Sequence, residues 1–167
     1  MLNICPAKEQ DAADILALQR LAFQSEAALY NDWSIPQLTQ SLDSLLAEFT
    51  SSVVLKALFG TRLVGSVRAT VVDGVCAIGR LMVHPEFQGR GIGARLLSVI
   101  EARHIGAEKY ELSTGSRSEA SIRLYQRHGY QICRTQSVSP TVSLVCLEKL
   151  GAPSNNSFKP NPLRCLA

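Results

Sequence analysis

The chain has 167 residues, of which 46% are hydrophobic and 19% charged, and its formal net charge is +3. This composition is typical of one folded globular domain rather than a disordered chain. The tail beyond Gly151 contributes Lys159 and Arg164 without an acidic residue, so the remainder is close to neutral, and no dense basic cluster indicates nucleic-acid binding.

The N-terminal part predicts a short strand and two helices. The segment "LNIC" is the strand, and Pro6 ends it. Apolar residues recur at helical spacing from Asp11, so the first helix is expected to run to about Ser25. The segment "QSEAALYNDWS" then interrupts the pattern and is expected to be irregular. A second helix begins with Ser34 as its N-cap and Pro36 in its first turn. Its apolar face consists of Leu38, Leu42, Leu45 and Leu46.

After Phe49 the hydrophobic period changes to that of strands. The runs "SSVVLKALFG", "RLVGSVRATVV" and "VCAIGRLMVH" predict three strands. Gly60-Thr61 joins the first two, and Asp73-Gly74, a strong hairpin signal, joins the next two. A helix over residues 91–104 follows and is expected to bury Ile92, Leu96, Leu97 and Ile100.

The C-terminal part predicts a strand, a helix, two strands and a tail. "KYELSTG" is the strand, and Ser116-x-x-Glu119 has capping-box spacing for a helix that ends at His128 with Gly129 as C-cap. "YQICRTQSV" and "TVSLVCLEKL" are the last strands. Residues 151–167, rich in Pro and Asn, are expected to be a tail outside the core. This tail resembles those of some bacterial gene-cassette proteins.

The cysteines and the N-terminus indicate the compartment. No two cysteines form a CxxC pair, which argues against a zinc site or a disulfide framework. Cys76, Cys133 and Cys146 lie in strand-like runs and are expected to be small core residues, whereas Cys165 is expected to be exposed. The N-terminus has no signal-peptide pattern, and no run of about 20 apolar residues would span a bilayer. We expect a bacterial-type cytoplasmic protein without a metal or a membrane partner.

The stretch "VHPEFQGRGIGARLL" places three glycines between an apolar strand and a helix. Because N–H groups at a helix N-terminus attract anions, glycines there let a pyrophosphate approach the main chain. Arg90 adds a positive charge. The alternative interpretation is a tight glycine-rich turn without a ligand. The spacing matches neither a P-loop nor the Rossmann fingerprint, which would need a third glycine three residues after Gly93.

The same stretch resembles the acetyl-CoA motif of the GCN5-related N-acetyltransferases (GNAT family), since Gln88, Gly91 and Gly93 fill its pattern Q/R-x-x-G-x-G/A. Further on, "SEASIRLYQRHGY" resembles the second hallmark of this family through Tyr125 and the pair Gly129-Tyr130. The resemblance covers residues 1–150. It implies the α/β GNAT acyl-CoA N-acyltransferase fold, a mixed, mostly antiparallel sheet of about seven strands flanked by four helices. In this family the fourth and fifth strands are splayed apart.

The resemblance also implies which residues bind acetyl-CoA, the cosubstrate. The backbone of Leu81-Met82-Val83 would pair with the pantetheine arm and polarise the thioester carbonyl. Ser118 stands where relatives often carry an asparagine that contacts CoA. The pyrophosphate would lie against a loop made of Gln88, Gly89, Arg90, Gly91, Ile92, Gly93 and Ala94.

Acetyl transfer from a thioester to an amine needs a neutral amine, a stabilised oxyanion and a proton for the leaving thiolate. The resemblance assigns the last task to Tyr125, and the alternative is an amphipathic core tyrosine. Two residues of the predicted strand 109–115 are candidates for the group that takes the proton from the amine, namely Glu111, acting through water, and Ser113. Glu26 and Asp32 are rivals for the base.

The segment that flanks the acceptor site in relatives offers Glu26, Tyr30, Asp32 and Trp33 as acceptor-binding candidates. Arg80 near the acetyl site favours an acceptor with a carboxylate or a phosphate, the alternative being a solvent-facing strand arginine. We therefore expect an N-acetyltransferase that moves an acetyl group directly from acetyl-CoA to the primary amine of a small or amino-acid-like molecule.

Three alternatives stay open at this point. They are acetylation of a protein N-terminus or lysine, a non-catalytic CoA-binding regulatory module, and use of a longer acyl-CoA. A homodimer, common in the family, would use the final strands or the tail.

Overall fold

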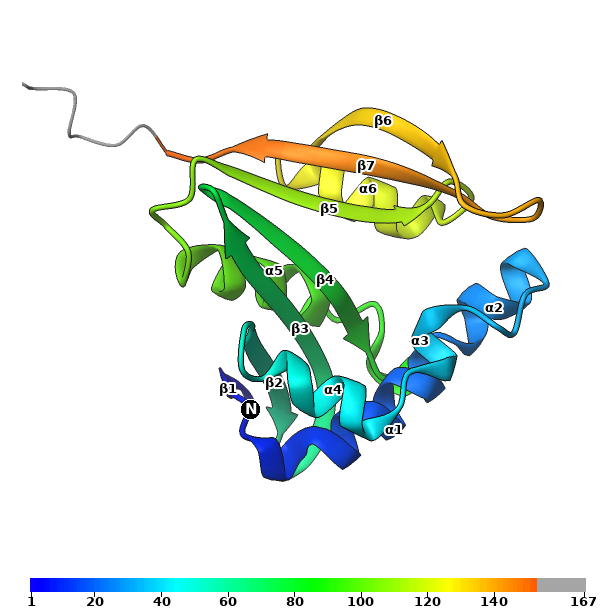
Figure 1. The fold of residues 1–167 in the computed structure, drawn as a ribbon. Helices are drawn as coiled ribbons and strands as arrows, with labels where there is room; N and C mark the ends of the chain where they lie inside the picture. Colours follow the sequence, from blue (N-terminus) through cyan, green and yellow to red (C-terminus); the bar gives the residue numbers. More distant parts are fainter. Residues whose placement is uncertain (153–167) are drawn as a thin grey trace, which may run out of the picture.

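The computed structural model of the chain describes residues 1–152, which form one seven-stranded sheet in the order β1-β2-β3-β4-β5-β7-β6 (Figure 1). Neighbouring strands are antiparallel except β4 and β5, which are parallel. This is the mixed, mostly antiparallel sheet that the sequence predicts. The strands are β1 (Leu2–Pro6), β2 (Val53–Phe59), β3 (Arg62–Val72), β4 (Val75–Val83), β5 (Lys109–Gly115), β6 (Gln131–Ser137) and β7 (Ser143–Leu150). Residues 153–167 of the predicted tail, and with them Cys165 and its predicted exposure, lie outside the described residues. The predicted boundary between domain and tail at residue 150 stays a prediction.

Helices cover both faces of the sheet. Within residues 1–152 they are α1 (Ala12–Ala22), α2 (Gln24–Tyr30), α3 (Pro36–Thr39), α4 (Leu42–Glu48), α5 (Ile92–Ala102) and α6 (Glu119–Arg127), with short 3-10 turns at Glu9–Asp11 and Pro85–Phe87. Helices α5 and α6 lie where the sequence predicts them, and the apolar residues predicted for the core side of α5 are all buried. The four predicted helices become six segments, because α2 forms in a segment predicted to be irregular and the second predicted helix is divided into α3 and α4.

The prediction that the segment after Ser25 is irregular is wrong. Residues 24–30 form α2, which ends where Asn31 adopts the left-handed conformation, with φ of 47°. Gln, Glu, Ala and Leu favour helix, but the segment shows no strong apolar period because only Ala27 and Tyr30 are buried. The helix therefore depends on contacts with distant parts of the chain.

The predicted helix from Ser34 to Leu46 is also wrong as one element. Ile35, not Ser34, is the N-cap of α3, although Pro36 is its first residue as predicted. Gln40 is extended, with ψ of 133°, and so ends α3. The next residue, Ser41, caps α4 by accepting a hydrogen bond from the backbone N–H of Ser44 at 3.1 Å.

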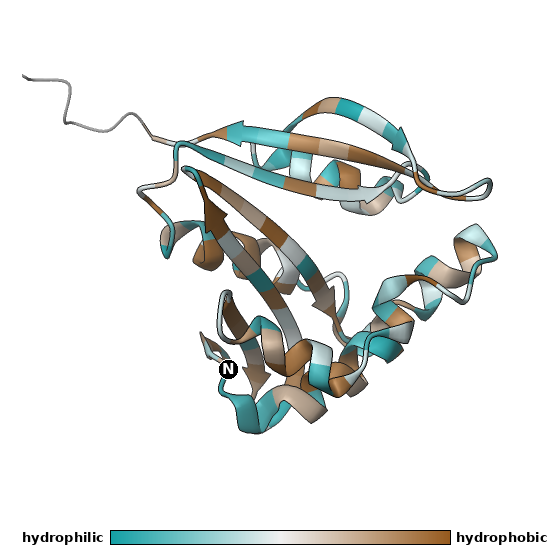
Figure 2. Ribbon diagram, in the orientation of Figure 1, coloured by the Kyte–Doolittle hydropathy of each residue, from teal (hydrophilic) through white to brown (hydrophobic). Residues whose placement is uncertain are grey.

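The apolar residues lie mainly between the sheet and the helices. Figure 2 shows β3 and β4 mostly brown and β6 mixed with teal. On one face of β2, Leu55 packs toward α5, and on the other Val54 packs with α1 and α4. Cys76 and Cys146 are buried as predicted, but the core prediction for Cys133 is wrong. Cys133 is exposed because β6 is the edge strand, in which all seven residues are exposed.

Strands β4 and β5 pair over only three residues and then diverge. The paired positions are Val75 with Lys109, Cys76 with Tyr110 and Ala77 with Glu111. Beyond Ala77 the two strands separate into a wedge, and α2 lies at its open end (Figure 1). The expectation that the fourth and fifth strands splay apart is therefore confirmed. The wedge leaves the C-terminal half of β4 without a partner on one edge.

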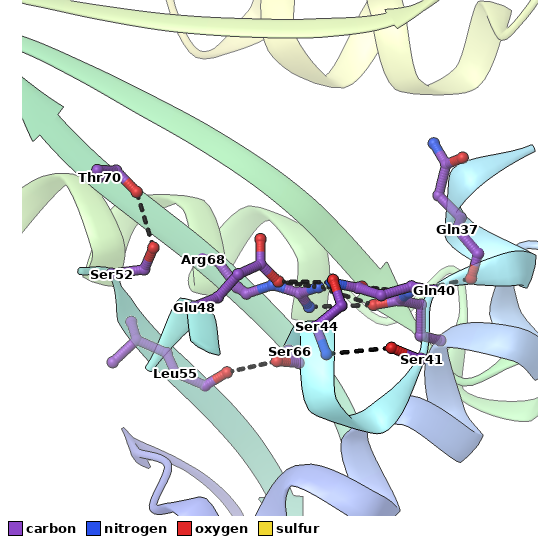
Figure 3. A network of polar contacts seen from close by, with 11 residues as sticks. Gln37, Gln40, Ser41, Ser44, Glu48, Ser52, Leu55, Ser66, Arg68 and Thr70 are labelled. Atoms are coloured by element: carbon purple, nitrogen blue, oxygen red, sulfur yellow. Dashed lines mark hydrogen bonds and ion pairs between the residues drawn. The ribbon is translucent and has the colours of Figure 1, made fainter. Parts of the chain in front are cut away.

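A buried arginine ties the helices to the sheet (Figure 3). Arg68 on β3 is 4% exposed, and its two terminal nitrogens donate to Gln19 Oε1 at 3.0 Å. The same group donates to Gln40 Oε1 at 2.9 Å and forms an ion pair with Glu48 at 3.0 Å. Gln40, where the chain leaves helical geometry, is thus also a partner of this arginine. Burial lowers the pKa of Arg68, and the charge of Glu48 opposes that shift.

We expect Arg68→Met to lower the free energy of unfolding by about 2–4 kcal/mol, because it leaves the buried Gln19 Oε1 without a donor and Glu48 without its ion-pair partner. Urea denaturation measures the change. The matched control in the same strand is Arg62→Met, whose ion pair with Glu86 is exposed and is worth about 0–1 kcal/mol. Equal losses in the two variants would show that the buried network contributes no more than a surface pair.

Candidate active site

The wedge between β4 and β5 contains a cleft of about 340 Å³. Side chains from both halves of the sheet, from α2 and from α6 meet in it. Its lining consists of Phe23, Glu26, Gln37, residues 77–81 and 111–115, Ser121, Tyr125, Arg134, Leu144 and Cys146. A cleft of this size, with a few converging polar groups, is the usual form of a small-molecule site.

The edge of β4 that faces the cleft is shaped by a bulge. Gly79 pairs with Arg68 and Met82 with Ser66, so two residues of β4, Arg80 and Leu81, oppose one residue of β3. Arg80 has a left-handed backbone with φ of 50°. Bulges redirect side chains and end regular pairing. Of the predicted strand Leu81-Met82-Val83, Leu81 lines the cleft, whereas the Met82 side chain is buried. An extended ligand can pair with the unpartnered backbone here.

The glycine-rich stretch forms the loop between β4 and α5. Gly89 and Gly91 have φ of 76° and 77°, and no atom lies within 4 Å of where their Cβ atoms would be. The backbone conformation, rather than a lack of space, is therefore what favours glycine at these two positions. Gln88 Nε2 donates to the carbonyl of Val83 at 3.3 Å. Arg90 lies over the ring of Phe87, with 4.9 Å from Cζ to the ring centroid.

This loop ends at the N-terminus of α5, an eleven-residue helix whose first helical residues are Ile92, Gly93 and Ala94. The first N–H groups of a helix have no partner within it and, with the helix dipole, attract anions. Arg90 adds a fixed positive charge beside them. The loop predicted from the sequence to hold a pyrophosphate thus has a backbone and a charge that suit an anion.

Tyr125 on α6 forms part of the wall of the cleft. It is 7% exposed, lines the cleft and packs edge-on against Tyr130 at 6.1 Å between ring centroids. Burial, and secondly the negative charge of Glu26, raise the pKa of Tyr125 to about 12. The phenol therefore keeps its proton at neutral pH and can donate it to an anion that forms in the cleft.

Two carboxylates line the cleft, and their surroundings differ. Glu111 lies at the closed end of the wedge, opposite Ala77, and forms an ion pair with Lys109 at 3.0 Å. Glu26 comes from α2 and accepts a hydrogen bond from Ser118 Oγ at 2.6 Å. In residues 1–152, no cation lies within ion-pair distance of Glu26. Ser113, the other predicted catalytic residue, is exposed in the cleft.

Ser118 is buried beneath the cleft, where it joins α2 to α6. Its hydroxyl also lies 3.0 Å from Tyr30 Oη, which accepts a hydrogen bond from the backbone N–H of Arg117 at 2.8 Å. The predicted capping box at Ser116 is wrong. The N-cap is Ser118, and its side chain makes no capping hydrogen bond because it is used by Glu26. Its predicted contact with CoA stays a prediction.

The cleft contains two arginines without a carboxylate partner among the described residues. Arg80 is half-buried, and its Nε is buried without a hydrogen-bond partner. Burial lowers the pKa of Arg80, and the charge of Glu48 partly opposes this. Arg134 reaches the cleft from β6, and the buried Oε1 of Gln37 also lacks a partner. The cleft therefore contains two arginines that no carboxylate of residues 1–152 pairs with, beside the two glutamates of its lining.

The predicted acceptor-site residues are distributed unequally. Glu26 and Arg80 line the cleft, Tyr30 lies behind it through Ser118, and Asp32 and Trp33 are outside its lining. The Ser34 hydroxyl and N–H donate to Asp32 Oδ1 at 2.6 and 3.0 Å, and these hydrogen bonds lower the pKa of Asp32. Trp33 is 56% exposed.

Sequence reasoning missed several residues that line the cleft, among them Phe23, Gln37, Arg134 and Cys146. Arg134 and Cys146 are register partners on β6 and β7, and Cys146 pairs with Ser113 of β5. Only the strand order brings these residues to the site, so no local signal marks them.

No group of three or more His, Cys, Asp and Glu side chains in residues 1–152 is arranged to hold a metal ion. None of the helices in this part of the chain is long and apolar enough to cross a membrane.

Comparison with known proteins gives consistent matches. A sequence model described as the acetyltransferase (GNAT) family matches residues 14–130. The L-amino acid N-acyltransferase MnaT of Escherichia coli K12 is 28% identical over 147 residues, covering 78% of this chain and 80% of its own. The L-methionine sulfoximine/L-methionine sulfone acetyltransferase of Salmonella typhimurium LT2 is 28% identical over 142 residues, covering 75% and 78%. Among solved structures, the PaiA N-acetyltransferase of Thermoplasma acidophilum in complex with coenzyme A has a TM-score of 0.75 at 17% identity, covering 90% of this chain and 99% of its own.

We expect Gly115→Ala to disturb the contact between α2 and α6. A Cβ at Gly115 would overlap Tyr30 Oη, so Tyr30 must move away from Ser118. Overpacking of this kind costs about 1–3 kcal/mol, and thermal unfolding measures it. The matched control is Gly106→Ala, where no atom lies within 4 Å of the added Cβ. An unchanged melting temperature for Gly115→Ala would mean that Tyr30 is not fixed at this position.

Proposed function

The chain belongs to the acetyltransferase (GNAT) family, and from this premise we propose that it acetylates the primary amine of a small, amino-acid-like acceptor with acetyl-CoA. One observation carries the choice of acceptor. The cleft beside Tyr125 contains Arg80, whose buried Nε has no partner, together with Arg134. A buried unpartnered donor on a cation is costly, and an acceptor carboxylate would satisfy it.

The coenzyme side of the proposal rests on the loop and the strand edge. Gly89 and Gly91, in positive-φ conformations, lead into the start of α5, whose N–H groups would hold the pyrophosphate. The unpartnered edge of β4 at Leu81 would hydrogen-bond the pantetheine arm. Bound acetyl-CoA would supply an activated thioester carbonyl. The predicted contacts of Gln88, Arg90 and Ala94 belong to the same proposal.

The acceptor side rests on charge. Arg80 and Arg134 lie on opposite halves of the sheet, so a small molecule in the wedge can contact both. Arginine binds carboxylates in a planar, two-bond geometry. The names of two relatives, an L-amino acid N-acyltransferase and a methionine sulfoximine/methionine sulfone acetyltransferase, support an acceptor that carries a carboxylate.

The leaving group requires a proton, and Tyr125 is our candidate for its source. Its phenol is neutral at physiological pH because burial and Glu26 raise its pKa to about 12. A neutral phenol can donate a hydrogen bond to the sulfur, and pass its proton on, as the carbon–sulfur bond breaks. The proposal thus gives Tyr125 a role in the reaction rather than in packing alone.

The proposed function is tested by following CoA release from acetyl-CoA by chromatography, with L-amino acids, their amides and short peptides as acceptors. We expect amino acids to exceed their amides by about 10-fold or more in kcat/KM, because charge-assisted hydrogen bonds contribute about 1.5–3 kcal/mol. Arg80→Met should remove this preference, whereas Arg123→Met on the exposed face of α6 should keep it. Equal use of acids and amides, or use of peptides alone, would contradict the proposed acceptor, and acetyl-CoA binding without turnover would favour a regulatory module.

We expect Tyr125→Phe to lower kcat by about 100-fold, the low end of the effect of a positioned acid. Acetyl-CoA binding, measured by calorimetry, should persist because the ring still fills its place. Tyr110→Phe is the matched control, since the Tyr110 hydroxyl donates to the carbonyl of His104 away from the cleft. Full turnover by Tyr125→Phe would remove this phenol from the mechanism.

A further inference from the structure

We propose that Glu26 on α2 is the base that takes the proton from the acceptor's ammonium group, and that Ser118 holds the Glu26 carboxylate in position. This inference rests on the proposed function and adds to it a catalytic residue and a positioning residue. It places the catalytic base on α2, a segment that the sequence predicted to be irregular.

The first argument is the position of Glu26 among the reacting groups. Its carboxylate lines the cleft together with Tyr125 and Arg80. It is close enough to Tyr125 for its charge to raise the pKa of that phenol. A base that serves the amine must lie near the acid that serves the thiolate, because both bonds change at the same carbonyl carbon. Glu26 meets this condition.

The second argument is that Glu26 has free capacity to accept a proton. Ser118 donates to Oε2, and Oε1 has no hydrogen-bond partner within the described residues. Glu111, the other carboxylate of the cleft, is instead held by Lys109, which also pairs with Glu148 at 3.2 Å. An ion pair with Lys109 thus holds the Glu111 carboxylate, whereas no cation lies within ion-pair distance of Glu26 in residues 1–152.

The third argument is the unusual use of Ser118. A serine at a helix N-cap ordinarily accepts a hydrogen bond from the first turn of its own helix. Ser118 stands at the N-cap of α6 without that bond. Its hydroxyl donates a hydrogen bond to Glu26 at 2.6 Å and accepts one from Tyr30 Oη at 3.0 Å. Because a short, charge-assisted bond fixes its acceptor strongly, the capping residue of α6 orients a side chain of α2.

Several other titratable or charged groups surround the cleft and enter the pH dependence. From the elements packed around Glu26 these are Tyr30, Arg80, Glu111, Arg117, Tyr125, Arg134 and Cys146. Of these, Glu111 is the only other carboxylate that faces the cleft within residues 1–152. The phenols and the arginines do not change charge in the acid range, so a loss of activity there reports a carboxylate.

The proton balance is as follows. The acceptor R–NH₃⁺ gives one proton to Glu26, and its neutral nitrogen bonds to the thioester carbonyl carbon. When the carbon–sulfur bond breaks, the sulfur takes the proton of Tyr125, and the second proton of the nitrogen restores the phenol. Glu26 then releases its proton to water, which leaves the amide, the CoA thiol and one proton.

The test compares the pH profiles of kcat/KM for Glu26→Gln, Glu111→Gln and the wild-type chain, with an amino acid as acceptor. The wild type should be flat between the acid limb of Glu26 and the pKa of the acceptor. Glu26→Gln should be at least about 100-fold slower at neutral pH. Its kcat/KM should rise tenfold per pH unit up to the pKa of the acceptor, because only the neutral amine then reacts. Glu111→Gln should keep the flat profile.

Two further variants keep the inference falsifiable. Glu26→Asp retains a carboxylate and should restore the flat profile at a reduced kcat. Ser118→Ala should lower kcat with the flat profile kept, as expected of a positioning residue. Glu119→Gln, an exposed change in the first turn of α6 outside the cleft, is the control for activity. Calorimetry with acetyl-CoA confirms that each variant is folded.

The outcomes separate this inference from the proposed function. A wild-type chain that turns over no acceptor overturns the proposed function and, with it, the role of Glu26. An active wild type whose Glu26→Gln variant keeps the flat profile overturns the role of Glu26 alone. A tenfold rise per pH unit in Glu111→Gln, but not in Glu26→Gln, identifies Glu111 as the base instead.

Discussion

The separation of β4 from β5 after three paired residues is the constraint on which the site depends. Up to Ala77 the two halves of the sheet are continuous, and beyond it the backbone of β4 has no partner on that edge. Unpaired backbone groups inside a protein are costly, so this edge favours a ligand that can hydrogen-bond it. The same divergence gives the cleft two walls, one from β4 and one from β5 with β7 and β6. Every residue proposed to act in the reaction reaches the cleft from an element that borders this wedge.

Two arginines near the wedge, Arg68 and Arg80, differ in how many partners their guanidinium groups have inside the protein. On the helix-covered face of β3, both terminal nitrogens of Arg68 have partners in Gln19, Gln40 and Glu48, although its buried Nε has none, so Arg68 serves stability. Arg80 follows directly on the neighbouring strand, past Gly79, the register partner of Arg68. Its bulge and left-handed backbone turn it toward the cleft, where its guanidinium makes no hydrogen bond or ion pair within residues 1–152. Two arginines on neighbouring strands thus differ in function because the terminal nitrogens of Arg68 are bonded inside the protein, whereas those of Arg80 have no partner among the described residues and are available to a ligand.

Helix α2 connects the acceptor side to the catalytic side. It is short and has only two buried residues, so isolated it would not be stable. Tyr30 fixes its end through Ser118 and Arg117, and Gly115 makes room for the Tyr30 hydroxyl. The position of Glu26 therefore depends on contacts between residues about ninety positions apart, since Glu26 and Ser118 are separated by 92. The contacts that stabilise α2 are therefore the same contacts that place the Glu26 carboxylate.

The sequence by itself determined the elements whose signals are local. Alternating apolar residues marked the strands, Asp73-Gly74 marked a hairpin, and the glycines before Ile92 marked the loop that starts α5, because backbone conformation and period are encoded over a few residues. The motif residues around Gln88 and Tyr125 were found for the same reason. Only the tertiary structure decided that residues 24–30 are helical, that Gln40 ends α3 and bonds Arg68, that Cys133 is exposed on an edge strand, and that Arg134 reaches the cleft. These features depend on strand order and on contacts between distant segments, which no local pattern specifies.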